Sequence, residues 1–369
     1  MKITRISRIA ALGAVAALVL AGCASNEGGT SSNAPSDGPA LSGELAGGGA
    51  SSQEVAVQAW TAGFQGMNDG VTITYDPAGS GAGRESFQAG AVQFAGSDRA
   101  FKPEEIEAGP FDGCVEGTDI LELPTYISPI AVIFNVEGVD SLNLDAATIA
   151  GLFAGTITTW NDPAIAALNE GVDLPDTAVS PVHRADDSGT TENFTDYLFA
   201  SAPDVWTSEP DGVWPLSSGE AAQGTSGVVA AVAGGNGTIG YADASRAAEE
   251  GLSTAAVKVG DEFVEYSPEA AAAIVDESPF EDGRADGDLA IALDRTSDAA
   301  GVYPIVLVSY MIACQEYTDA DVAPVVKAFL QYIASAEGQD AAAAAAGNAP
   351  ISDSLREQVN SAIDLIAAE

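Results

Sequence analysis

The residues best suited to chemistry lie together in one stretch, 183–191, which reads HRADDSGTT. An apolar run at 178–182 precedes it as the end of a strand, and apolar residues at helical spacing follow from Phe194. The stretch is therefore predicted to join a strand to a helix, whose first backbone N–H groups have no partners within the helix. Its arginine, glycine and hydroxyls beside such amides would suit a tetrahedral oxyanion. An ordinary capped helix with a solvated arginine fits the same residues.

Two further turns carry small hydroxyl side chains at predicted helix starts. Ser51 and Glu54 fit a capping box ahead of an apolar helical stripe. Ser80 lies in the glycine-rich turn 76–83, between an alternating strand and a helix expected to begin near Arg84. This turn lacks the Lys-Ser/Thr pair of a nucleotide P-loop, and it matches a dinucleotide fingerprint only weakly.

A carboxylate completes this set of element ends. Asp98 lies at the carboxyl end of a short strand predicted at 92–98, and ligands of open α/β sheets collect at that edge. Each of the four places alone is commonly a turn or a cap. Their recurrence, with three of the four at predicted helix N-termini, favours a binding site.

The overall charge restricts the class of partner. The formal net charge is −41, and it becomes −44 without residues 1–22, which hold three basic and no acidic residues. Such a surface argues against binding to nucleic acid and against electrostatic attachment to anionic lipid. A buried anion site remains compatible with it, because salt screens exposed charges beyond roughly 8 Å.

The N-terminus has the features of an export signal. A basic start, an apolar run and the sequence LAGC predict a signal peptide at 1–22 and lipidation of Cys23. The apolar run is too short to span a bilayer. Residues 24 to about 42 are rich in Ser, Gly, Asn, Pro and Ala, and predict a flexible tether. We therefore expect an exported protein held at a membrane surface.

The remaining cysteines predict one disulfide and no metal. Cys114 and Cys314 are the two cysteines left after Cys23, and two cysteines in an exported chain favour a bond between them. Closing so long a loop could stabilise the fold by about 4–5 kcal/mol in the chain-entropy model. A single histidine, His183, argues against a His/Cys zinc site.

Strands alternating with helices predict an α/β architecture. The clearest strands are 71–75 and 237–241, a helix is expected from Gly224, and another over 321–346. Leu355, Val359, Ile363 and Ile366 mark a last helix. Apolar runs at 127–136 and 303–310 are predicted to be two crossings between domains.

With these pieces together, residues 43–369 resemble the PstS-type phosphate-binding lipoproteins of bacterial phosphate ABC transporters. The most specific stretches are IAGLFAGTI at 149–157 with WNDP at 160–163, and HRAD followed by SGTT at 183–191. GSG at 79–81, FAGSD at 94–98 and GTIGY at 237–241 agree in order and context. The resemblance implies a two-domain periplasmic-binding-protein (Venus-flytrap) fold, with a hinge and a ligand cleft between domains. Domain I would comprise 43–126 with 309–369, and domain II 127–308.

The resemblance also implies the residues of a phosphate site. Domain I would contribute Ser51, Ser80 and Asp98, and domain II Arg184, Ser188, Gly189 and Thr190. Ser51 stands where threonine is common, so the hydroxyl is retained. Asp187 stands where glycine is common, which adds a carboxylate near the anion. Asp186 could orient Arg184, although a solvent-facing role fits its position equally well.

Residue chemistry supports phosphate independently. Near neutral pH phosphate keeps at least one proton, and sulfate keeps none. The carboxylate of Asp98 can accept a hydrogen bond from protonated phosphate but would repel sulfate, which gives specificity by a penalty. Arg184 offers a planar fork for two oxygens, and the hydroxyls and helix-end amides supply further donors.

The resulting hypothesis is a monomeric, lipid-anchored receptor for inorganic phosphate, without a cofactor. It would sit on the outer face of the cytoplasmic membrane and deliver phosphate to permease subunits of the ABC transporter. Three alternatives remain: a same-fold receptor for sulfate, molybdate or phosphonate, a phosphoester or acyl hydrolase, and a purely structural surface protein. The hydrolase would use His183, Asp186 and Ser188, yet a base five residues before its nucleophile in one loop would struggle to reach it.

Overall fold

A computed structural model describes residues 41–367 of the chain. The predicted signal peptide, Cys23 and residues 24–40 of the tether lie outside the described residues. Ser42, which we assigned to the tether, already begins the first strand. None of the helices in the described part has the length and apolar character needed to cross a bilayer.

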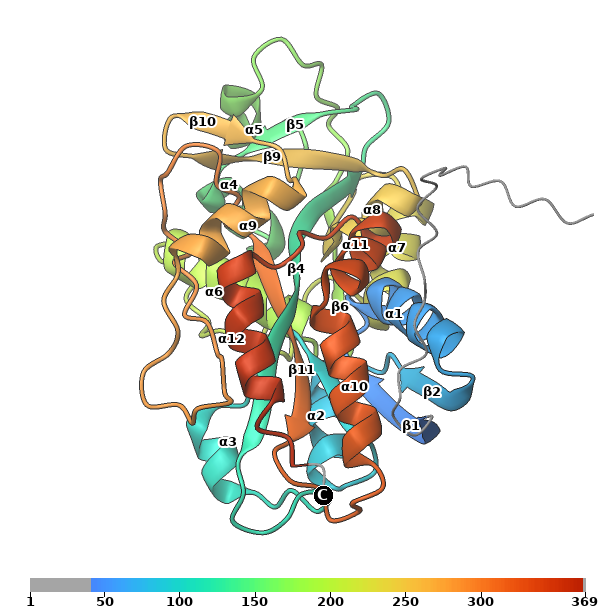
Figure 1. The fold of residues 1–369 in the computed structure, drawn as a ribbon. Coiled ribbons are helices and arrows are strands. Elements are labelled where there is room, and N and C mark those ends of the chain that lie inside the picture. The colour runs from blue at the N-terminus through green and yellow to red at the C-terminus, as the bar shows by residue number, and fades with distance from the viewer. Residues whose placement is uncertain (1–40, 368–369) are drawn as a thin grey trace, which may run out of the picture. The chain divides into compact units, whose positions relative to one another are not determined.

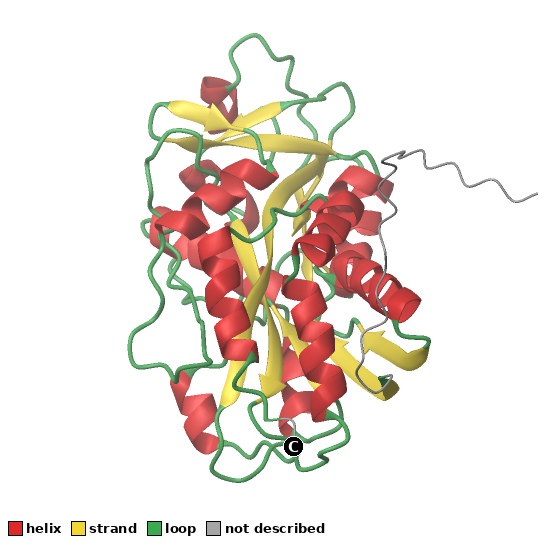
Figure 2. Cartoon of the chain, in the orientation of Figure 1, coloured by secondary structure: helices red, strands yellow, loops and turns green. Residues whose placement is uncertain are grey.

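Strands and helices alternate along the described residues, which confirms the α/β class (Figure 2). The strands are β1 Ser42–Gly49, β2 Gly70–Asp76, β3 Phe94–Ser97, β4 Ile120–Asn135, β5 Leu142–Leu144, β6 Ser180–Arg184, β7 Glu220–Ala222, β8 Thr238–Asp243, β9 Ser253–Val259, β10 Glu262–Val264 and β11 Val306–Cys314. The helices are α1 Glu54–Met67, α2 Ser80–Gln88, α3 Pro103–Ala108, α4 Ala146–Ala154, α5 Pro163–Leu168, α6 Gly189–Ser201, α7 Gly224–Gly234, α8 Ala244–Glu249, α9 Pro268–Glu277, α10 Ala323–Ala334, α11 Ala336–Ala346 and α12 Asp353–Ile363.

The long strand β4 connects two groups of strands in the order β2-β1-β3-β11-β4-β8-β6-β7 (Figure 1). Its first part pairs antiparallel with β11, up to Pro129 opposite Val306. From Ile130 onward β4 pairs with β8 instead. We call β1, β2, β3, β11 and the first part of β4 the first lobe. The last part of β4, with β8, β6 and β7, is the second lobe.

Strands β4 and β11 are almost completely buried. Every residue of β11 is buried, and so is every residue of β4 except Asn135. Such continuous apolar runs are typical of strands covered on both faces. Helices α10 and α12 pack beside each other over these strands (Figures 1 and 2). The two crossings predicted at 127–136 and 303–310 lie in this region, and β4 begins earlier than predicted, at Ile120.

The strand β1 was not predicted, because its sequence SGELAGGG is rich in glycine. Glycine is poorly suited to strands in general, but here it permits close packing. A Cβ on Gly47 would lie 2.2 Å from the ring of Phe94 on the neighbouring strand β3. The strand therefore owes its composition to the aromatic side chain packed against it.

Two predicted helix starts were wrong. Helix α1 is capped by Gln53 without a side-chain bond, so Ser51 and Glu54 form no capping box. Helix α2 begins at Ser80 rather than near Arg84. Gly79 has φ +116°, and this left-handed conformation turns the chain sharply enough for the helix to start at the next residue.

The C-terminal helices also differ from the prediction. The helix expected over 321–346 is divided into α10 and α11 at Ser335. Ser335 has extended backbone angles, and its hydroxyl accepts a hydrogen bond from Gly338 N, which starts a new helix. The last helix ends at Ile363, so Ile366 lies beyond it.

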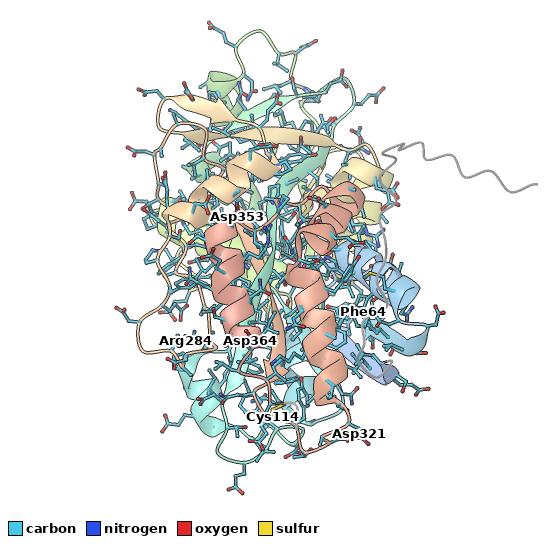
Figure 3. All side chains as sticks on the ribbon, in the orientation of Figure 1. Phe64, Cys114, Arg284, Asp321, Asp353 and Asp364 are labelled. Carbon is cyan, nitrogen blue, oxygen red and sulfur yellow. A yellow bond between two sulfur atoms is a disulfide. The ribbon has the colours of Figure 1, made fainter. Side chains whose placement is uncertain are left out.

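The predicted disulfide is confirmed: Cys114 and Cys314 are bonded, with their Cα atoms 5.3 Å apart. Cys314 ends β11, and Cys114 lies in the loop before β4, where Figure 3 labels it (Figure 3). The bond closes a loop with a sequence separation of 200 residues, and it lies within the first lobe.

Replacing both cysteines by alanine should lower the free energy of unfolding by about 2–5 kcal/mol, since the unfolded chain would no longer be closed into a loop. Urea unfolding of the C114A/C314A variant beside the wild type measures this change. Unfolding curves that coincide with each other would contradict it, as would two free thiols in the mass spectrum of the exported protein.

Candidate anion-binding site

All seven predicted site residues are buried, and an unbroken series of contacts connects them. The backbone N–H of Asp98 donates to Ser80 Oγ at 3.1 Å, and Thr190 Oγ1 donates to Asp98 Oδ2 at 3.1 Å. Gly189 lies so close that a Cβ there would be 2.6 Å from Ser80 Oγ. The site therefore joins the start of α2, the end of β3 and the start of α6, as the sequence predicted.

Ser51 joins this group through the start of α7. Thr225 N donates to Ser51 Oγ at 3.1 Å, and the two hydroxyl oxygens are 3.0 Å apart. The preceding residue, Gly224, donates its N–H to Asp186 Oδ1 at 3.0 Å. The start of α7 thus converges on the site together with those of α2 and α6, and both α6 and α7 lie in the part of the chain that follows β4.

Three serine hydroxyls in the site are anchored in the same way. Ser51, Ser80 and Ser188 each accept a hydrogen bond from a backbone N–H, donated by Thr225, Asp98 and Thr191 respectively. Because the N–H occupies the hydroxyl oxygen, the hydroxyl hydrogen remains available for another acceptor. The site is therefore rich in donors, as an anion requires.

Arg184 supplies the positive charge of the site. Its side chain is almost fully buried, and its Nε donates to Asp186 Oδ1 at 2.9 Å while Nη2 contacts the other carboxylate oxygen. The Arg184 hydrogen bonds and charge lower the pKa of Asp186, outweighing the effect of burial. Asp186 is thus placed to orient the guanidinium, which is one of the two roles left open by the sequence.

Asp98 is a buried carboxylate surrounded by donors. Burial is the largest influence on its pKa and raises it above the ordinary value. Hydrogen bonding by the hydroxyls of Ser52, Ser309 and Thr190, together with the charge of Arg184, acts in the opposite direction. These donors favour the ionised form of Asp98 despite its burial.

Comparison with known proteins identifies the family. The PBP superfamily domain matches residues 33–337. The phosphate-binding protein PstS 3 of Mycobacterium leprae (strain TN) is 35% identical over 379 residues, covering 100% of both chains. The chain belongs to the PstS-type family. PstS 2 of Mycobacterium tuberculosis (strain ATCC 25618 / H37Rv) is 33% identical over 382 residues, again covering 100% of both chains.

Solved structures show the same fold. The periplasmic phosphate-binding protein PfluDING, bound with phosphate, has a TM-score of 0.70 and 23% identity over 86% of this chain and 93% of that chain. A phosphate-binding protein from Stenotrophomonas maltophilia has a TM-score of 0.67 and 21% identity, over 87% and 94%. This PstS-type chain thus has the predicted two-domain periplasmic-binding-protein fold.

Several site contacts in this PstS-type chain were not predicted. Ser52 donates to Asp98 Oδ1 at 2.6 Å, and Asn193 Nδ2 donates to the backbone oxygen of Asp98 at 2.7 Å. Two further residues were also not predicted: Thr225, whose N–H donates to Ser51, and Ser309, which acts to lower the pKa of Asp98. Ser52 directly follows a predicted ligand and Thr225 lies at the start of a predicted helix, so the sequence provided a weak indication that both belong to the site. Asn193 and Ser309 had none.

The residues of the hydrolase alternative are not arranged for catalysis. The ring of His183 stacks on Trp214 with centroids 4.9 Å apart, and its Nδ1 is 2.9 Å from the backbone oxygen of Arg184. The Ser188 hydroxyl accepts from Thr191 N, and Asp186 binds Arg184. The family's members are named as binding proteins, so the chain is assigned to solute-binding proteins and not to enzymes.

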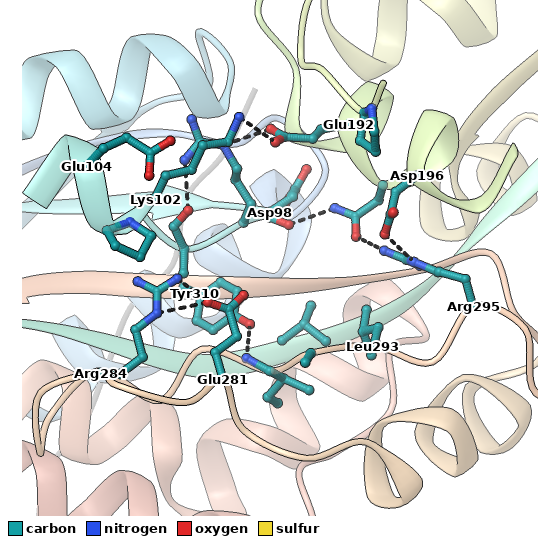
Figure 4. Close-up of a pocket in the computed structure, with 18 residues that line it drawn as sticks. Asp98, Lys102, Glu104, Glu192, Asp196, Glu281, Arg284, Leu293, Arg295 and Tyr310 are labelled. Carbon is teal, nitrogen blue, oxygen red and sulfur yellow. Dashed lines mark hydrogen bonds and ion pairs between the residues drawn. The ribbon is translucent and has the colours of Figure 1, made fainter. Parts of the chain in front are cut away.

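A cavity of about 440 Å³ lies beside Asp98, but its cations already have partners (Figure 4). Glu192 on α6 is 2.7 Å from Arg99 and 3.5 Å from Lys102. Arg295 pairs with Asp196 at 2.9 Å. Because the charges are matched, this cavity is less suited to an anion than the donor-rich site. Arg84 is likewise occupied, since it donates to Ser97 Oγ at 2.9 Å and lies 3.7 Å from Asp187.

A second buried carboxylate, Asp243, adjoins the site at the end of β8. It is fully buried, and Tyr126 OH donates to its two oxygens at 3.1 and 3.2 Å. Burial is the largest influence on the pKa of Asp243 and raises it, as does the charge of Asp98, while hydrogen bonding by Ser245 and Ser128 lowers it. The net result is a pKa of about 6. Asp243 is therefore a group of this site that titrates near pH 6.

Asp243 should reduce stability as pH rises. Its folded-state pKa exceeds the ordinary value of 3.8, so the folded protein binds the proton more tightly than the unfolded chain does. Its contribution is present in full below the unfolded pKa and is lost as pH rises through about 6, by on the order of 3 kcal/mol. In Asp243→Asn, urea unfolding across this range should lack that decline. Parallel pH profiles for variant and wild type would contradict the assignment.

Proposed function

We propose that this chain is the phosphate-binding receptor of a bacterial phosphate ABC importer, with Asp98 as the residue that selects the ligand. Inorganic phosphate would lie between the lobes, bound by Ser51, Ser80, Asp98, Arg184, Ser188, Gly189 and Thr190. The observation that carries the proposal is a buried acceptor, Asp98, among anchored hydroxyl donors and an arginine fixed by Asp186.

The donors and the acceptor have different tasks in this proposal. The hydroxyls, the first amides of α6 and the guanidinium of Arg184 would neutralise the anion in a site with little water. Asp98 would accept the proton that phosphate retains. Sulfate offers no such proton, so its oxygen would face the carboxylate with repulsion, and molybdate would meet the same penalty. Relatives named PstS and a phosphate-bound structural neighbour support phosphate as the ligand.

Binding and release would involve movement of two domains, 43–126 with 309–369 and 127–308. Contacts that would close with them include Ser51 with Thr225 and Asp98 with Thr190. A switch of strand partners within β4, at Pro129 and Ile130, supports a hinge there. The closed form would then deliver phosphate to the permease.

We further propose that Cys23 is lipidated after removal of residues 1–22, which would hold a monomer on the outer face of the cytoplasmic membrane. The LAGC sequence and the tether composition support this location. The ligand would require no cofactor, and no cluster suited to a metal ion occurs among residues 41–367.

Replacing Asp98 by asparagine should reduce the preference for phosphate over sulfate, because an amide can donate to a sulfate oxygen as well as accept. Loss of a charge-assisted hydrogen bond to phosphate should weaken phosphate binding by about tenfold or more. Calorimetry with phosphate, sulfate and molybdate on the chain lacking residues 1–23 measures both effects.

A matched control is Asp145→Asn, which changes the cap of α4 away from the site and keeps a good capping residue. This variant should bind like the wild type. If the wild type bound sulfate or molybdate as tightly as phosphate, another oxyanion would be the ligand. Unchanged selectivity in Asp98→Asn would remove Asp98 from its proposed role.

A further inference from the structure

The carboxylate of Asp98 is held by hydroxyls from separate elements of the fold. Ser52, just before α1, donates to Oδ1 at 2.6 Å, and Thr190 of α6 donates to Oδ2 at 3.1 Å. Each carboxylate oxygen has about two lone-pair positions. Each therefore keeps room for one more donor after these hydrogen bonds are made.

A third hydroxyl, that of Ser309 on β11, lies at the position opposite Asp98. Strands β11 and β3 pair antiparallel with Tyr310 opposite Ser97, so the next position places Ser309 opposite Asp98. Residues directly opposite in such a pair present their side chains on the same face. The pairing of β11 with β4 is irregular between Ser309 and Tyr310, and bulges beside functional sites commonly redirect a side chain.

Ser309 has no evident structural task apart from Asp98. Its side chain is fully buried, and within residues 41–367 its hydroxyl oxygen has no hydrogen-bond partner. A buried hydroxyl without a partner is unfavourable, so its position is best explained by the neighbouring carboxylate of Asp98. The hydroxyls of Ser52 and Ser309 both act to lower the pKa of Asp98.

We propose that Ser52 and Ser309 are specificity-determining residues that hold Asp98 as an oriented, acceptor-only carboxylate. They act through Asp98 and are positioning residues rather than ligands. This inference rests on the proposed function and deepens it. It assigns the discrimination between phosphate and sulfate to the hydroxyls of Ser52 and Ser309, which act on the acceptor Asp98. Without these donors, burial would favour the protonated carboxyl, which can donate to sulfate.

The charged and titratable neighbours of Asp98 do not by themselves keep its carboxylate ionised. Arg184 on β6 favours the ionised form. Asp243 at the end of β8 and Asp98 oppose each other's ionisation, and Tyr75 on β2 is also influenced by the charge of Asp98. Arg84 is turned to Ser97 and Asp187 instead. Among these neighbours, Arg184 alone thus opposes the effects of burial and of Asp243 on the ionisation of Asp98. The hydroxyls supply the remaining stabilisation of the ionised form.

The test is calorimetry of phosphate and sulfate over a series of pH values, from mildly acidic to mildly alkaline, with Ser52→Ala, Ser309→Ala and the double variant. Removing one hydroxyl should raise the pH at which the phosphate-to-sulfate affinity ratio falls, by about half to one pH unit. The double variant should shift further. Ser52→Thr, which keeps the hydroxyl, should retain the wild-type profile.

Thr238→Val is the matched control, because Thr238 is a buried residue at the start of β8 whose hydroxyl donates to Val232 O and not to Asp98. It should leave the ratio unchanged. If wild type prefers phosphate but the alanine variants share its pH profile, the inference is wrong while the proposed function stands. An equal loss of affinity for phosphate and for sulfate at every pH would also overturn the inference. Failure of the wild type to bind phosphate would overturn both.

Discussion

The structure depends most on keeping one negative charge, that of Asp98, in a place where water does not reach. Burial alone disfavours an ionised carboxylate, and it raises the pKa of Asp98. The surrounding structure opposes this with hydroxyl donors and with Arg184 across the site. A site for an anion that contains its own buried anion makes sense when the ligand carries a proton to share. In the proposed function, this apparent conflict of charge is the source of selectivity.

Meeting that constraint requires elements that are distant in sequence. Asp98 follows β3, and its hydroxyl donors come from just before α1 and from the start of α6. Ser309 of β11 lies opposite Asp98, and Arg184 ends β6. The crossing strands β4 and β11 hold these pieces in register. The strongly acidic surface does not prevent anion binding, because salt screens its exposed charges over short distances. The buried donors of the site are not screened in this way. The disulfide at the end of β11 fastens the same strand to the loop before β4.

Sequence reasoning found the parts of the site whose signal is local. The segment 183–191 has a strand before it and a helix after it, and the structure places Ser188 as the cap of α6. Helix-start patterns also pointed to Ser51 and Ser80, to which the resemblance to PstS-type proteins assigned a role in phosphate binding, although their local geometry was predicted incorrectly. Gly79 starts α2 earlier through its positive φ, and Ser51 bonds to Thr225 instead of capping α1. The strand β1 escaped prediction because its glycines reflect packing against Phe94. Ser309 could not be found at all, since its place opposite Asp98 follows from strand register between residues far apart in the chain.

The most direct test of this account is a crystal structure of the chain, without residues 1–23, grown with phosphate. We expect the anion between the starts of α2 and α6, with the Arg184 guanidinium on two of its oxygens and a third oxygen within hydrogen-bonding distance of Asp98. The hydroxyls of Ser51, Ser80 and Ser188 should also contact it. Phosphate bound in the cavity lined by Arg99 and Lys102, or bound in the site without touching Asp98, would contradict the account.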